Sequence, residues 1–87
     1  MENTIEEGEQ SKEGKISVNG REVEIKGKNA TGLEIKRAAI KQGVPIRETF
    51  VLQEELPNGS SRIVGDGDPV HLRPGLKFTA IAPDDNS

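Results

Sequence analysis

Residues 15–26, KISVNGREVEIK, decide the fold of this 87-residue chain. Apolar and polar positions alternate on both sides of Asn19-Gly20, as they do in half-buried strands. Asn-Gly is the dipeptide that best tolerates the two positive φ angles of a type I′ hairpin turn. Pairing of Val18 with Arg21 across this turn brings the apolar side chains to one face, namely Ile16, Val18, Val23 and Ile25. The stretch predicts a β-hairpin with one buried face.

A helix is predicted after the hairpin. Thr31 and Glu34 form an S/T-x-x-E capping box ahead of LEIKRAAIKQ, and Gly43 supplies a stop signal after it. The pattern predicts a helix near residues 32–42. On its helical wheel, we expect two side chains to face the core, namely Ile35 and Ala39.

Three later segments have the composition of strands: FVLQEE (50–55), RIV (62–64) and KFTAIA (77–82). Pro57-Asn58-Gly59 predicts a turn between the first two, whereas VHL (70–72) is too short to assign. Alternation along the last segment places Phe78, Ala80 and Ala82 on one face, with Thr79 and Ile81 on the other.

The order hairpin, helix, strand, turn, strand predicts an α+β domain in which one helix packs on a four- to five-stranded mixed sheet. This is a β-grasp layout. We place the folded domain at residues 15–82, between a leader (1–14) and a tail (83–87).

The two ends differ in charge from the body. Residues 1–14 carry five glutamates against one lysine, a net of −4 with few apolar residues, which is typical of a disordered acidic leader. The whole chain carries −3, so residues 15–87 carry +1. The last strand is followed at once by Pro83, Asp84, Asp85, Asn86 and Ser87. We expect this tail to be extended and accessible, with simple fraying as the alternative.

Catalysis by this chain is not expected. Its only histidine, His71, lies between Val70 and Leu72 and has a structural or solvent-facing position, and no cysteine is present to serve as a nucleophile or thiolate ligand. Asp66-Gly67-Asp68 lacks the later ligands of an EF-hand loop and predicts a surface turn. We therefore expect no catalytic residue, no metal site and no cofactor.

Nucleic-acid and membrane partners are not expected either. Lys36, Arg37 and Lys41 of the predicted helix have no aromatic stacking platform beside them, which favours a solvated helix face. The sequence contains no apolar run of the roughly 20 residues that span a bilayer, and its start lacks a secretory signal pattern. We expect a cytoplasmic protein that is monomeric in isolation.

Four stretches together resemble a known family: ISVNGREVEIK, TGLEIK, DGDPVHL and KFTAIAP. They are similar to the bacterial multiubiquitin-domain, ubiquitin-like proteins over about residues 15–83. The closing APDDNS also resembles the single-domain modifiers encoded in bacterial ubiquitination-like operons beside an activating enzyme, a conjugating enzyme and a metallopeptidase. The resemblance implies a ubiquitin-like β-grasp fold.

It also implies a function for the tail. In ubiquitin-like modifiers an activating enzyme adenylates the terminal carboxylate, a conjugating enzyme receives the acyl group, and a target amine then attacks it and becomes attached. This chain departs from the familiar diglycine ending, since it ends in Asp84-Asp85-Asn86-Ser87. Three explanations stay open: a wider, more basic enzyme channel, trimming by a peptidase, or binding without conjugation. A sulfur carrier is disfavoured by the missing diglycine.

The resemblance also implies a recognition patch on the outer sheet face. If Phe78 and its alternate neighbours are core residues, Thr79 and Ile81 lie on that face. Val51 or Leu52 joins them, depending on whether Phe50 points inward. The rival to a modifier is a non-covalent binding module that uses this sheet face for docking.

Overall fold

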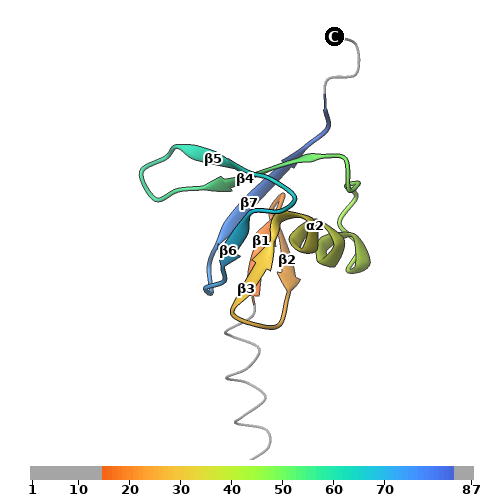
Figure 1. The fold of residues 1–87 in the computed structure, drawn as a ribbon, viewed down its shortest axis with the longest axis horizontal. Helices are drawn as coiled ribbons and strands as arrows, with labels where there is room; N and C mark the ends of the chain where they lie inside the picture. The colour runs from red at the N-terminus through yellow and green to blue at the C-terminus, as the bar shows by residue number, and fades with distance from the viewer. Residues whose placement is uncertain (1–14, 84–87) are drawn as a thin grey trace, which may run out of the picture.

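The computed structural model describes residues 15–83. One α-helix packs against a five-stranded mixed sheet with the order β2-β1-β7-β4-β5, and a two-stranded sheet, β3-β6, lies beside it (Figure 1). The elements are β1 (Lys15–Val18), β2 (Arg21–Glu24), β3 (Asn29–Thr31), α2 (Gly32–Lys41), β4 (Val51–Glu55), β5 (Ser61–Val64), β6 (Pro69–His71) and β7 (Lys77–Ile81). This is the ubiquitin-like β-grasp arrangement, so the predicted fold class is confirmed.

The β1–β2 hairpin has the predicted turn and register. Asn19 and Gly20 have φ angles of 54° and 79°, as a type I′ turn requires. Val18 pairs with Arg21 and Ile16 with Val23, and three of the four predicted inward side chains are buried while Ile25 packs partly against them.

Helix α2 begins at the predicted capping box. The Glu34 N–H donates to the Thr31 hydroxyl at 3.2 Å, and the Thr31 N–H donates to the Glu34 carboxylate at 2.8 Å. The helix ends at Lys41, one residue before the predicted end. Ile35 and Ala39 are fully buried, as expected.

The β3–β6 pair was not predicted, and it determines how the helix sits on the domain. β6 lies antiparallel to β3, so the preceding turn, residues 65–68, meets the start of α2. The N–H groups of Gly32 and Leu33 donate to the carbonyls of Asp68 and Asp66 at 3.1 and 3.2 Å. Two of the N–H groups that a helix leaves unpaired at its start are satisfied in this way.

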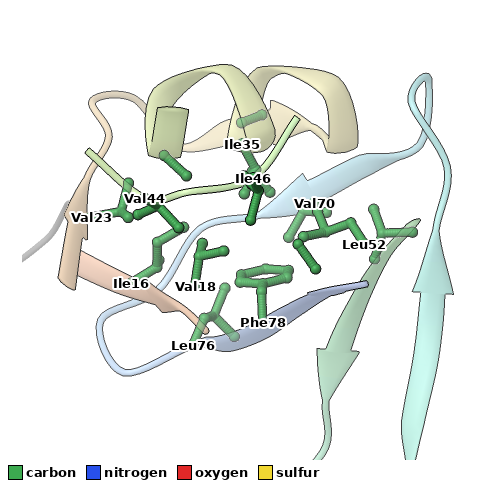
Figure 2. Close-up of a cluster of buried hydrophobic side chains, with 14 of the residues drawn as sticks. Ile16, Val18, Val23, Ile35, Val44, Ile46, Leu52, Val70, Leu76 and Phe78 are labelled. Carbon is green, nitrogen blue, oxygen red and sulfur yellow. The ribbon is translucent and has the colours of Figure 1, made fainter. Parts of the chain in front are cut away.

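The core lies between α2 and the inner face of the sheet (Figure 2). Phe78 of β7 points into it from the sheet and is 1% exposed, while Ile35 points into it from the helix. One prediction for this face is wrong: Ala82 is exposed, because β7 ends at Ile81 and leaves Ala82 beyond the covered part of the sheet.

Candidate functional site

β7 is the central strand of the sheet and carries the C-terminal segment. It pairs in parallel with β1 and antiparallel with β4, and the last paired residue is Ile81, opposite Val51. Ala82 is exposed and Pro83 half-buried. Of the five predicted tail residues, only Pro83 lies within the described residues, since Asp84, Asp85, Asn86 and Ser87 fall outside them.

The Asn19 side chain fixes the end of β7. Its Oδ1 accepts from the Ala80 N–H at 2.8 Å, and its Nδ2 donates to the Ala80 carbonyl at 3.2 Å. The backbone ladder from β1 has already ended at this point, with the Asn19 N–H donating to Phe78. One amide side chain therefore extends the sheet by one further pair of hydrogen bonds toward the tail.

Replacing Asn19 by glycine should remove these two hydrogen bonds and leave the turn intact, because glycine accepts the positive φ but has no side-chain amide. We expect the free energy of unfolding to fall by about 1–2 kcal/mol, since the net contribution of one hydrogen bond to stability is roughly 0.5–1.5 kcal/mol. In native-state hydrogen exchange, the substitution should accelerate exchange of the Ala80 amide more than exchange of the Phe78 amide, each compared with the same amide in the parent chain. Unchanged exchange at Ala80 would contradict the assignment.

The outer face of the sheet carries a small apolar patch. Cross-strand partners lie on one face of a sheet, so the pairs Val51–Ile81, Gln53–Thr79 and Gln53–Ile63 place these five side chains together. Ile63 is 66% exposed, Ile81 is 46% exposed and Val51 is half-buried. We call these five residues the outer-face patch.

Three of the four residues predicted for this surface, Thr79, Ile81 and Val51, lie on it, and Leu52 does not. Leu52 is 1% exposed and points into the core, where it pairs with Ala80 and Val64 (Figure 2). Of the two alternatives that the sequence left open, Val51 is therefore the outward one. Sequence reasoning missed Ile63 because the short β5 segment had no assigned register, and it missed Gln53 because the outward side of β4 was left open.

The centre of the outer-face patch is uncharged. The Thr79 hydroxyl donates a hydrogen bond to the Glu55 carboxylate at 2.8 Å, and the Ser61 hydroxyl donates one to the Gln53 side chain at 3.3 Å. Charged side chains, Glu55 and Lys77, stand opposite each other at one end. The patch therefore combines three aliphatic side chains with two uncharged polar ones, and charged residues adjoin it at this end.

Lys36 does not belong to a solvated helix face, contrary to the prediction for Lys36, Arg37 and Lys41. It is 3% exposed. Its Nζ donates to the carbonyls of Glu48 and Phe50 at 2.6 and 2.8 Å and lies 2.7 Å from the Asp66 carboxylate. These three acceptors match the three donors of an ammonium group, which is why the charge can be buried.

The remaining predicted polar features lie on the surface. Asp66-Gly67-Asp68 forms the expected turn, in which the Asp68 carboxylate accepts from the Gly65 N–H at 2.8 Å. His71 is exposed on β6. Between residues 15 and 83, no three histidine or carboxylate side chains gather closely enough to hold a metal ion. Over the same residues, no helix has the length and apolar composition needed to cross a membrane.

A crevice of about 530 Å³ adjoins the outer-face patch. Its wall includes Val51, Ile63 and Val64 together with Lys36 and Asp66. The crevice lies where β4 and β5 diverge, beyond their last pair, Leu52 and Val64. The candidate site is thus an exposed surface of three aliphatic and two uncharged polar side chains with a neighbouring hollow.

Comparison with known families identifies this domain. The Multiubiquitin family profile matches residues 15–84, from the first strand to the residue after Pro83. Comparison with curated proteins returns no match, nor does comparison with solved structures. Since the profile covers most of the chain and the fold is a ubiquitin-like β-grasp, the chain belongs to the multiubiquitin family of ubiquitin-like proteins.

Proposed function

We propose that this ubiquitin-like protein is a bacterial protein modifier whose C-terminal carboxylate becomes attached to target amines. The observation that carries the proposal is the position of β7. The central strand is held on both sides up to Ala80 and Ile81, and the residue after it, Ala82, is exposed. A rigid body thus presents the start of a segment that an enzyme would have to grip.

The chemistry of the proposed pathway belongs to the partners. An activating enzyme joins the carboxylate to AMP from ATP and releases pyrophosphate. An enzyme thiolate then displaces AMP to give a thioester, a conjugating enzyme accepts the acyl group, and a target lysine amine displaces the thiol to form an isopeptide bond. The chain supplies only the acyl group, from Ser87 or from a residue exposed when a metallopeptidase trims the tail. We place this pathway in the cytoplasm, where ATP is available.

The outer-face patch has a role in this proposal as the surface that the enzymes recognise. Ile81 lies two residues before Pro83, so a partner bound to the patch is adjacent to the start of the tail. Removing apolar side chains from water drives such contacts at roughly 25 cal/mol per Å². Recognition of the body and threading of the tail would therefore involve neighbouring surfaces.

Lys36 is unsuited to act as an acceptor for chains of this modifier. Its amine is buried and already donates to three oxygen atoms. By contrast, Lys15 and Lys77 have side chains at the surface. If chains form within residues 15–83, exposed lysines such as these are the proposed sites.

Co-expression with the adenylating, conjugating and peptidase enzymes encoded beside the gene tests the proposal. Covalent adducts of this chain on other proteins should appear in mass spectrometry of the enriched protein. A chain without residues 83–87 should give none, whereas a chain without residues 2–14 should still form them. Adducts that persist after deletion of the tail would reject the modifier function.

The alternative function is a non-covalent binding module, which the exposed Ile63 and Ile81 favour. Replacing Ile81 by aspartate distinguishes the two. Ile81 is 46% exposed and lies outside the core, so the change should leave the fold intact and cost within about 0.5 kcal/mol of stability. It should weaken enzyme or partner binding at least about tenfold, a loss of 1.4 kcal/mol.

This variant and the tail deletion together decide between the two functions, when adducts are measured by mass spectrometry and binding by titration calorimetry with each purified enzyme. A modifier loses adducts in both variants. A docking module loses binding in Ile81→Asp alone and is indifferent to the tail. Thr79→Ser, which keeps the hydroxyl near Glu55, is the matched control and should behave as the parent chain.

A further inference from the structure

The two edges of the five-stranded sheet, β2 and β5, differ in their availability. On β2, the side-chain amide of Gln42 binds the backbone of Glu24. The Glu24 N–H donates to Oε1 at 2.9 Å, and Nε2 donates to the Glu24 carbonyl at 2.6 Å. These are the hydrogen bonds that an added strand would make, so Gln42 from the end of α2 occupies one of the two outward-facing residues of the short β2 edge, Glu24, and leaves Glu22.

The β5 edge has the opposite property. The Leu56 N–H donates to the Ser60 carbonyl at 2.8 Å, which fixes Leu56 and Ser60 as a hydrogen-bonded pair. Opposed residues of an antiparallel ladder alternate between bonded and non-bonded pairs. Arg62 and Val64 therefore bond to β4, and the N–H and C=O groups of Ser61 and Ile63 point away from the sheet.

These outward groups have no other partner in the part of the chain that the structure describes. No hydrogen bond from residues 15–83 outside the strand ladders reaches the backbone of Ser61 or Ile63. Unpaired N–H and C=O groups along an exposed edge are the template for strand addition. The occupant that such an edge fits is an extended polypeptide, whose backbone supplies donors and acceptors at the same spacing.

The side chains of β5 define the chemistry of that polypeptide. Ile63 is 66% exposed on the outer face and adjoins the crevice at the end of the strand. Arg62 is on the inner face, where its Nε donates to the buried Glu54 carboxylate at 2.9 Å. Its side chain is still 56% exposed, so terminal guanidinium donors are available at the edge.

We propose that β5 is a strand-addition site for an extended peptide in which aliphatic and acidic residues alternate. The aliphatic side chains pack against Ile63 and continue the outer-face patch, and an acidic side chain on the other face pairs with Arg62. This surface goes beyond the proposed conjugation function, and its test does not require any enzyme of that pathway.

A second copy of this chain fits the edge poorly. Two-fold pairing of Ser61 with Ile63 of the second copy would place the Arg62 residues of both copies opposite each other, and like charges in that position are destabilising. A four-residue strand also offers much less than the roughly 1,200–2,000 Å² that stable interfaces bury. The first argument favours an acidic partner, and the second favours a weakly bound peptide over a stable dimer.

Amide hydrogen exchange by NMR on the full chain tests the open edge. In the free chain, the Ser61 and Ile63 amides should exchange at least about tenfold faster than those of Arg62 and Val64. A synthetic peptide of seven alternating glutamate and valine residues, acetylated and amidated, is the probe. At millimolar concentration it should slow exchange at Ser61 and Ile63 and shift the β5 resonances.

A matched peptide with lysine in place of glutamate should give at least about tenfold weaker binding. Protection of both amides in the free chain, equal binding of the two peptides, or shifts confined to β2 would each overturn the proposal.

Two variants test the edge directly. Ser61→Pro removes an outward N–H, a change that an edge strand tolerates. It should abolish the response to the glutamate peptide while the fold is retained. Ile63→Ser keeps the N–H and should weaken binding, which covers the case of a poorly folded proline variant. Gln42→Ala, at the opposite edge, should leave the β5 response unchanged. Equal responses in Ile63→Ser and the parent chain would contradict the role of Ile63.

Discussion

Replacement of Lys36 by alanine is expected to lower the free energy of unfolding by about 2–4 kcal/mol, because two backbone carbonyls lose their donor and each loss costs roughly 1–3 kcal/mol. The Asp66 carboxylate is 61% exposed, so water can solvate it in the variant. The Lys36 ammonium joins three segments, because it starts from α2 and binds the carbonyls of Glu48 and Phe50 and the carboxylate of Asp66. Without it, the partly buried carbonyls of Glu48 and Phe50 lose their donor. Folded domains have a stability of only about 5–15 kcal/mol, so this loss is a large fraction of the total.

Urea denaturation followed by far-ultraviolet circular dichroism measures this loss, because the chain has no tryptophan or tyrosine for fluorescence. Arg37→Ala is the matched control on the same helix. Arg37 pairs with Glu48 at 3.1 Å, but both side chains are more than half exposed, and exposed pairs contribute about 0–1 kcal/mol. Similar losses of unfolding free energy in the two variants would show that the contacts of Lys36 with Glu48, Phe50 and Asp66 contribute no more than an exposed ion pair.

Gly32→Ala should destabilise the domain by about 2 kcal/mol, although alanine is normally the better helix former by about 1 kcal/mol. A Cβ at Gly32 would overlap the carbonyl oxygen of Gly65 and lie 3.1 Å from the Val64 side chain. The Gly65 backbone cannot move freely, since the 65–68 turn binds the first N–H groups of α2. The change should therefore separate the helix from this turn.

Thermal unfolding measures the effect, and Gly67→Ala in the same turn is its control. A Cβ at Gly67 would meet nothing within 4 Å, so a change within about 0.5 kcal/mol is expected there. Faster exchange of the Leu33 amide in Gly32→Ala, but not in Gly67→Ala, would locate the damage. A stabilised Gly32→Ala protein would mean that helix propensity outweighs the contact with Gly65.

Local chemistry explains which parts of the fold could be predicted from the sequence. The hairpin followed from Asn19-Gly20, because few other dipeptides accept two positive φ angles, and the helix start followed from the Thr31 and Glu34 pair. Both signals act over four or fewer residues. Alternation then identified β7 and its inward Phe78.

Long-range contacts explain what could not be predicted. β3 and β6 are three residues each and meet across about 40 positions of sequence, so neither has a pattern of its own. Lys36 lies on the helix like its exposed neighbour Arg37. Its burial depends on carbonyls at residues 48 and 50 and on Asp66, which only the folded chain brings together.

Only part of the outer-face patch could be predicted, because strand alternation is a local pattern whereas strand pairing is long-range. Thr79 and Ile81 followed from the alternation of β7, but the adjacent residues Val51 and Leu52 could each have been the outward one. Pairing with β7 decides between them, because it sets Leu52 opposite the buried Ala80. Ile63 became part of the patch only through the register of β5 on β4.

The parallel pairing of β1 with β7 has a mechanical consequence. Besides the hydrogen bonds of the paired strand residues, five further hydrogen bonds join the two segments side by side, from Gly75 with Lys15 to Ala80 with the Asn19 amide. Tension between the start of β1 and the end of β7 would shear all of these bonds together instead of opening them one after another. The rate of forced unfolding depends on the free-energy barrier to breaking these bonds. A protein attached to its target through the end of β7 would thus resist being pulled apart from its two ends more strongly than its modest size suggests.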